Sequence, residues 1–266
     1  MVILSSAGFI CSVFGVKPKV KKILISLSVR QFYYFWAIHT QRTDMERNIS
    51  RKNLYTNAFL IASLVLILAA VVLCLALPRE TVHLAFNSFH SRFLDFLFRG
   101  WTLLGSGVGA LAIILVTLFF RIRYTLILLA GFAISGISVQ LLKHLFFSGA
   151  ARPVKYFELA GSGADLYLVP GVDLHSWYSF PSGHSATAFA LLFGISLILK
   201  NNWVRMLALV LAAGVAYSRI YLSQHFLIDV TGGAVIGLLA GYLGWWWINR
   251  YNRRWLRQSL PEAIRR

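Results

Sequence analysis

The chain has 266 residues, of which 58% are hydrophobic and 13% are charged. Soluble domains carry about a quarter of their residues as charged side chains, so this composition excludes an ordinary soluble protein and favours membrane-spanning helices. The formal net charge of +17 is compatible with nucleic-acid binding, and the distribution of the basic residues along the chain has to decide whether it indicates a nucleic-acid partner.

The N-terminal part, residues 1–54, is predicted to be a basic cytoplasmic segment ahead of the first span. Residues 1–16 are apolar, but they are short for a span and have no leading basic region, so they do not fit a signal peptide. Met45 stands just before a basic stretch and the first apolar window. A hypothesis that follows is that residues 1–44 are an upstream extension of the gene model, which N-terminal sequencing of the purified protein tests.

Windows of about 20 apolar residues, the length that crosses a bilayer as a helix, predict transmembrane spans. Six such windows cover residues 55–77, 101–120, 124–142, 184–200, 204–221 and 226–248. The expected fold is therefore an all-α, polytopic membrane helical bundle with one domain over residues 55–248. An even number of crossings returns the chain to its starting side, so the basic tail, residues 249–266, is expected in the cytoplasm.

The 26 Lys and Arg residues follow this layout. Nine precede the first span, six follow the last, and four lie in the short inner turns, which places nineteen on the inner side. The outer loops hold only seven. This bias is the one that the positive-inside rule describes. Topology therefore accounts for the net charge, and no nucleic-acid partner is expected.

Two stretches bear on packing rather than on chemistry. Residues 80–98 mix apolar and polar side chains in a way that suits a helix in the outer interface, and we interpret them as a connector. Gly233, Gly237 and Gly241 recur at every fourth position of the last span. Small residues at this spacing predict the close approach of a neighbouring helix.

Three polar clusters fall at the outer ends of the third to sixth spans, where charged groups are costly unless they are paired or used. The second cluster, Pro181-Ser182-Gly183-His184, lies at the start of the fourth predicted span, and the first N–H groups of a helix bind anions. In the third, a histidine and an aspartate four residues apart share one helix face. The clusters are Lys143 with Arg152-Pro153, then Pro181-Ser182-Gly183-His184, then Ser218-Arg219 with His225 and Asp229.

Each cluster has an ordinary explanation by itself. A His and Asp pair on one helix face is more often structural than catalytic, Pro-Ser-Gly-His can be a turn with a helix cap, and single cations near the headgroups can snorkel. Their combination is different, because three cations, a helix N-terminus and two histidines form a pocket for an oxyanion with a nucleophile and an acid. Phosphoryl transfer requires this set of groups.

The combination resembles the three-part signature of the type-2 phosphatidic acid phosphatase superfamily, which is a Lys ahead of Arg-Pro, then Pro-Ser-Gly-His, then Ser-Arg with a following His and Asp. The second and third parts match at every position, and the layout of the spans over about residues 55–248 matches as well. One departure is visible. The gap in the first part is longer than usual, because eight residues separate Lys143 from Arg152.

The resemblance implies a membrane phosphatase that hydrolyses a lipid phosphate monoester or diphosphate and releases inorganic phosphate. Neutral His225 is then the nucleophile and forms a phosphohistidine. Asp229 fixes the tautomer of that imidazole, as the third member of a triad does. His184 is the general acid that protonates the leaving group and later activates water. The phosphate-binding residues are then Lys143, Arg152, Ser182, Gly183 and Arg219.

No metal or other cofactor is expected at this site, because three cations would repel a divalent ion and the histidines lack the spacing of a zinc-binding helix. The expected partners are the bilayer and a membrane lipid phosphate. Members of the superfamily act on phosphatidic acid, phosphatidylglycerol phosphate, undecaprenyl diphosphate and lipid A phosphates, and nothing in the sequence separates these substrates. The resemblance also favours a multi-pass protein of the bacterial inner (cytoplasmic) membrane, with its active site facing the periplasm or exterior.

Two other functions stay open at this point. A lipid phosphotransferase would use the same site but pass the phosphate to another lipid, so it would release little phosphate without its acceptor. A non-catalytic polytopic protein, such as a channel, a transporter or a lipid-binding protein, would line a pathway with intramembrane charges. In that case replacing His225 would alter binding or flux and would remove no phosphatase activity.

Overall fold

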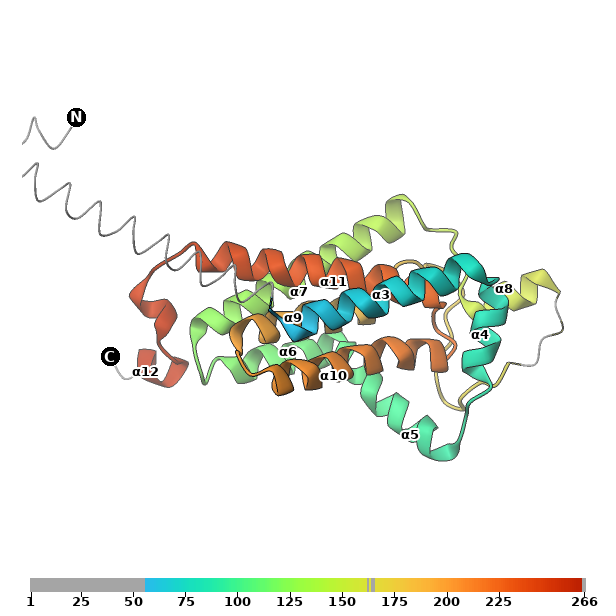
Figure 1. Ribbon diagram of the computed structural model, residues 1–266, viewed down its shortest axis with the longest axis horizontal. Helices are drawn as coiled ribbons and strands as arrows, with labels where there is room; N and C mark the ends of the chain where they lie inside the picture. The colour runs from blue at the N-terminus through green and yellow to red at the C-terminus, as the bar shows by residue number, and fades with distance from the viewer. Residues whose placement is uncertain (1–55, 162, 164–165, 265–266) are drawn as a thin grey trace, which may run out of the picture. The chain divides into compact units, whose positions relative to one another are not determined.

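The computed structural model describes residues 56–161, 163 and 166–264, and the predictions for residues 1–54 lie outside this part. The described residues fall in one compact unit that begins at Thr56. Their regular structure is entirely helical, which confirms the all-α prediction (Figure 1). The helices are α3 Ala58–Ala76, α4 Arg79–Asn87, α5 Arg92–Trp101, η1 Thr102–Gly105, α6 Gly107–Thr117, α7 Ile122–Leu145, α8 Pro153–Ala160, α9 Gly183–Ile198, α10 Asn202–Tyr221, α11 Leu227–Asn249, η2 Arg254–Arg257 and α12 Leu260–Ile264.

Four of the described helices, α3, α7, α10 and α11, are long and apolar enough to cross a membrane. A fifth crossing is counted if residues 92–105 and 107–117 form one span, although the two parts are bent by 61°. Helix α9 has 16 residues and is shorter than these spans. The chain is therefore a multi-pass membrane protein with four or five candidate spans in its described part, and the count of six stays a prediction.

The second predicted span, residues 101–120, differs most from the expectation. The helix is interrupted at Ser106, where the backbone is extended. The Ser106 hydroxyl oxygen caps the start of α6 by accepting a hydrogen bond from the N–H of Gly109 at 3.1 Å. A serine cap of this kind starts a new helix rather than continuing the preceding one. Hydrophobicity alone predicted one long helix because it does not register the cap.

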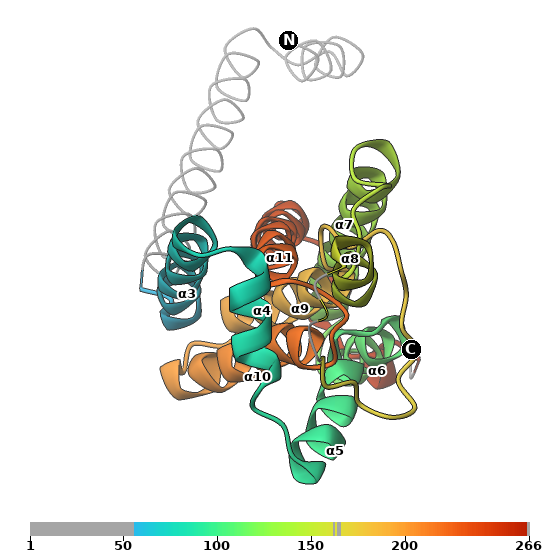
Figure 2. The same cartoon turned by 90° about the vertical axis from the view of Figure 1, so that its right-hand side faces the viewer.

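Helix α9 lies at the centre of the bundle and is contacted by α7, α10 and α11 (Figure 2). Most of its side chains are buried in protein rather than turned toward lipid. Helix α11 comes closest, through the glycines that the sequence singled out. A Cβ atom would lie 2.4 Å from the carbonyl oxygen of Ser182 if added at Gly233, and 2.5 Å from that of Ala186 if added at Gly237. The predicted close packing is confirmed, and it brings the first turn of α11 against the start of α9.

Gly237→Ala is expected to lower the free energy of unfolding by about 1–3 kcal/mol, because overpacking forces the two helices apart. The added Cβ would also lie 2.6 Å from the Cβ of Phe189. Gly136→Ala on α7 is the matched control, since nothing lies within 4 Å of a Cβ there. Thermal unfolding in detergent compares the two variants, and a Gly237→Ala protein as stable as the wild type would show that α9 and α11 separate at no cost.

The bundle has two chemically different ends. At one end the tail pairs with the turn between α6 and α7, where the N–H of Ile122 donates to the carbonyl oxygen of Gln258 at 2.9 Å and the N–H of Leu260 to that of Leu118 at 2.9 Å. At the other end lie α4 and α8 (Figure 1). Helices α7 and α10 end there and α9 and α11 begin there, so the three polar clusters lie at this second end.

Candidate active site

The ends of four helices gather the polar clusters around His184. Lys143 lies in the last turn of α7, Arg219 in the last turn of α10 and His184 in the first turn of α9. Arg152 directly precedes α8, and His225 lies in the loop between α10 and α11. The charges of Arg219, His225, Lys143 and Arg152 all act on His184, which places these groups around one centre. Lys143 therefore lies near the other site residues despite the longer gap in the first part of the signature.

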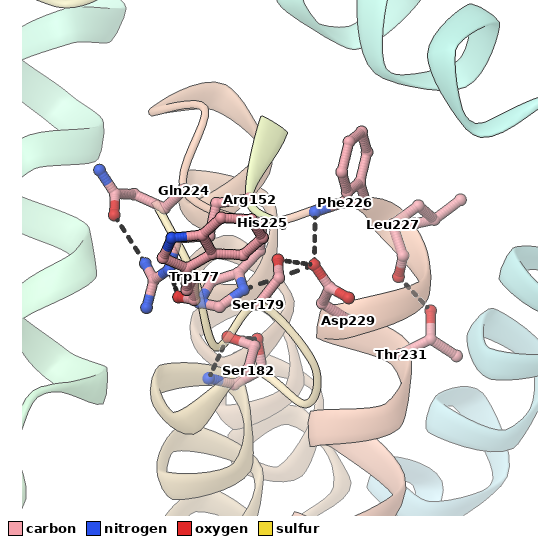
Figure 3. A network of polar contacts seen from close by, with 11 residues as sticks. Arg152, Trp177, Ser179, Ser182, Gln224, His225, Phe226, Leu227, Asp229 and Thr231 are labelled. Atoms are coloured by element: carbon pink, nitrogen blue, oxygen red, sulfur yellow. Dashed lines mark hydrogen bonds and ion pairs between the residues drawn. The ribbon is translucent and has the colours of Figure 1, made fainter. Parts of the chain in front are cut away.

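His225 is almost completely buried and faces the carboxylate of Asp229. The distance between His225 Nδ1 and Asp229 Oδ2 is 3.5 Å, which is longer than a normal hydrogen bond (Figure 3). The same oxygen accepts the hydroxyl of Ser179 at 2.5 Å and the N–H of Phe226 at 2.9 Å. A carboxylate beside Nδ1 favours the tautomer with its proton on Nδ1, which leaves the lone pair of Nε2 available for attack.

The protonation of His225 suits a nucleophile. Burial lowers the pKa of His225 to about 4, and Asp229 opposes that shift only in part. The imidazole is therefore neutral at pH 7. Neutral imidazole is the form whose nitrogen can attack phosphorus.

The loop before α11 ties the nucleophile to Arg219. The N–H groups of Gln224 and His225 both donate to the carbonyl oxygen of Arg219, at 3.0 and 3.2 Å. Ser223 allows this reversal by adopting a left-handed backbone with φ 51°. The spacing between the arginine and the histidine of the third cluster is thus the length of one tight loop.

The start of α9 is fastened to the start of α11. Ser182 is fully buried, and its backbone N–H donates to the carbonyl oxygen of Asp229 at 2.9 Å. Its hydroxyl oxygen caps α9 by accepting the N–H of Ser185. The N–H groups of Gly183 and His184 belong to the first turn, where a helix has no carbonyl partner for them and carries a partial positive charge.

Among the described residues, Lys143, Arg152 and Arg219 have no carboxylate partner within 4 Å, and the ion pairs formed there join Glu80, Glu158 and Asp229 to other bases. Arg152 is 9% exposed and Arg219 is 8% exposed. Arg219 donates to the hydroxyl of Thr102 at 2.9 Å, while its buried Nε has no hydrogen-bond partner in the part of the chain that the structure describes. Buried positive charge without a counter-charge is costly, so an anion placed beside these side chains would be stabilised.

Sequence reasoning missed several features of the loop over residues 147–181. It contains α8, which has two recognisable signals: Pro153 in the first turn and Gly161 in a left-handed conformation at the end. The sequence also did not single out Ser179 in this loop or Gln224 beside the third cluster. Ser179 contacts Asp229, and Gln224 contacts Arg152. Only their positions beside the second and third clusters set these two residues apart from other polar loop residues.

The part of the chain that holds this site is similar to known proteins. Residues 124–253, from α7 through α11, match the model of the PAP2 superfamily. Lipid A 1-phosphatase of Porphyromonas gingivalis is 40% identical over 70 residues, which are 26% of this chain and only 16% of that protein. Lipid A 4′-phosphatase of Bacteroides thetaiotaomicron is 25% identical over 162 residues, which are 60% of this chain and 72% of that protein.

A solved structure extends the likeness to the fold. It is a transmembrane PAP2 type phosphatidylglycerolphosphate phosphatase from Bacillus subtilis, with 25% identity and a TM-score of 0.53. The alignment covers 73% of this chain and 98% of that one. The segment that matches the PAP2 superfamily, residues 124–253, contains every candidate site residue, and this part of the chain belongs to that superfamily.

Proposed function

We propose that the protein is a membrane phosphatase that removes phosphate from a lipid headgroup and releases it as inorganic phosphate. The observation that carries this proposal is that buried Arg152 and Arg219 have no carboxylate partner within 4 Å among the described residues, together with the unpartnered Nε of Arg219 in the same part of the chain. A phosphate group would supply the missing charge and the missing acceptor. The neutral histidine beside these cations supplies a nucleophile.

The proposed reaction has two steps. In the first, Nε2 of His225 attacks phosphorus, a phosphorus–nitrogen bond forms and the bond to the lipid oxygen breaks, while the protonated ring of His184 donates a proton to that oxygen and becomes neutral. In the second, neutral His184 accepts a proton from water, the water oxygen attacks phosphorus, and the phosphorus–nitrogen bond breaks, which releases phosphate and restores neutral His225. Asp229 stabilises the positive charge that develops on the His225 ring.

The remaining residues would bind the transferring group. Lys143, Arg152 and Arg219 would neutralise its equatorial oxygens, and the first N–H groups of α9, at Gly183 and His184, would donate to them. The hydroxyl of Ser182 would add a donor, because it serves as an acceptor in capping α9 and keeps its own proton. Catalysis would then depend on positioning and on charge, as in other phosphoryl transfers.

The substrate class follows from the relatives. They are named for lipid A and for phosphatidylglycerolphosphate, both of which are membrane lipids carrying a phosphate monoester. The site at one end of the bundle would meet such headgroups at the membrane surface. We propose the bacterial inner membrane with the site on the periplasmic side, because the topology predicted from the sequence puts nineteen of the 26 Lys and Arg residues on the side opposite the outer loops.

The test is release of inorganic phosphate by the purified protein in detergent, with EDTA present throughout. Lipid A, phosphatidylglycerolphosphate, phosphatidic acid and undecaprenyl diphosphate are compared as lone substrates. We expect release from at least one of the monoesters without added metal. Among the described residues no three His, Cys, Asp or Glu side chains are grouped as metal ligands. Strict dependence on Mg²⁺ or Zn²⁺ would contradict the metal-independent route, and release only after an acceptor lipid is added would identify a phosphotransferase.

A further inference from the structure

Gln224 directly precedes His225 in the chain and is 2% exposed, yet it lies outside the three clusters. Its Oε1 accepts a hydrogen bond from Nη1 of Arg152 at 2.9 Å, and its Nε2 donates one to the carbonyl oxygen of Asp173 at 2.9 Å. These partners fix the orientation of the amide, because turning it over would place an NH₂ group against a guanidinium and one carbonyl oxygen against another. A buried side chain with one defined orientation is suited to holding a neighbour in place.

The neighbour that it holds is a proposed phosphate ligand. Nε of Arg152 donates to the carbonyl oxygen of Trp177 at 3.0 Å, so Trp177 and Gln224 hold the guanidinium at two of its nitrogens. The backbone N–H of Arg152 also donates to the carbonyl oxygen of Ser176 at 2.9 Å. A guanidinium has five N–H donors, so the remaining ones can contact an anion.

The loop segment that contains Trp177 also contacts Asp229, which lies beside His225. Ser179 donates its N–H to the carbonyl oxygen of Ala150 at 3.0 Å and its hydroxyl to Asp229 at 2.5 Å. The contacts therefore form a closed path from His225 through Gln224 to Arg152, along residues 177–179, and through Asp229 back to His225 (Figure 3). A change in the position of Arg152 would therefore reach His225 both through Gln224 and through residues 177–179 and Asp229.

We propose that Gln224 is a positioning residue that sets the guanidinium of Arg152 at a fixed place relative to His225. This inference rests on the proposed function, because it assigns Arg152 to the transferring phosphate. Without Gln224 the guanidinium keeps its charge but loses one of two anchoring acceptors. A misplacement of about 1 Å in a reacting group can cost about 100-fold in rate.

The test is a double-mutant cycle of Gln224→Met and Arg152→Lys. Methionine keeps the length of the side chain and removes both amide contacts, and lysine keeps the charge but removes the forked geometry that Gln224 orients. We expect Gln224→Met to lower kcat by about 10-fold to 100-fold in the protein that keeps Arg152. In the Arg152→Lys protein, the same change should lower kcat by less than about 3-fold. Gln140→Met on α7 is the matched control, since Gln140 is exposed, and it should leave kcat unchanged.

Affinity for orthovanadate is measured in the same four proteins, from the rise in melting temperature with vanadate concentration. Vanadate adopts the geometry of the transferring phosphate, so its dissociation constant reports the position of Arg152 even if no lipid tried is a substrate. We expect it to increase about 10-fold or more for Gln224→Met beside Arg152 and less than about 3-fold in the Arg152→Lys protein.

The outcomes separate the two proposals. An inert wild type that binds vanadate with this coupling would reject the phosphatase proposal and keep the positioning role. Equal losses from Gln224→Met in both backgrounds would reject the positioning role, because a merely structural residue lowers activity and affinity whatever stands at position 152. A wild type that is active while Gln224→Met is unimpaired would also reject it, and so would a wild type that neither turns over lipid nor binds vanadate.

Discussion

His225→Ala is expected to lower kcat for phosphate release by about 10³-fold or more, because no other group would provide the attacking nitrogen. The wild-type imidazole is buried, neutral and aimed by Asp229, so its loss removes the first chemical step rather than substrate binding. The measurement is initial-rate phosphate release at saturating lipid in detergent. His90→Ala serves as the control, since His90 is exposed at the same end of the bundle and lies outside the three clusters.

Covalent labelling tests the same prediction more directly. With a substrate labelled in its phosphate, rapid quenching under alkaline conditions should recover label on wild-type protein that is released by acid, as a phosphorus–nitrogen bond requires. The His225→Ala protein should carry no label while its melting temperature stays near that of the wild type. Acid-labile label on a folded His225→Ala protein would place the nucleophile on another residue.

His184→Ala has the second largest expected effect, a loss of about 10²-fold to 10⁴-fold on lipid substrates, which is the usual range for general acid–base catalysis. A lipid alkoxide is a poor leaving group and needs the proton that His184 would donate. The charges of Arg219, His225, Lys143 and Arg152 act on this ring, so it lies among the groups that would bind the transferring phosphate.

A substrate that needs no acid isolates this role. 4-Nitrophenyl phosphate has a good leaving group, so the first step should proceed in the His184→Ala protein while attack of water on the phosphohistidine becomes slow. We expect a burst of about one nitrophenolate per active site, followed by a much slower rate. The same loss on both substrates with no burst would show that His184 acts in binding or folding, and His225→Ala should show no burst.

Local sequence rules determined much of this protein. Apolar windows identified α3, α7, α10 and α11, and glycines at every fourth position identified the face on which α9 and α11 meet. They also identified the candidate site residues, because each cluster lies next to a predicted helix end. An i, i+4 pair and a helix N-terminus are local geometry, so their meaning is readable without the rest of the fold.

The tertiary structure decided what depends on distant partners. It brought Lys143 close enough to Arg152 for their charges to interact despite the longer gap between them, and contacts with residues 176 and 177 hold Arg152. It also gave Gln224 and Ser179 their partners, which lie 72 and 50 positions away in the chain. Hydrogen bonds between such distant positions leave no local pattern, because each depends on how loops from several helices meet. The sequence alone therefore indicated the candidate reacting groups, and the fold indicated the residues that are in contact with them.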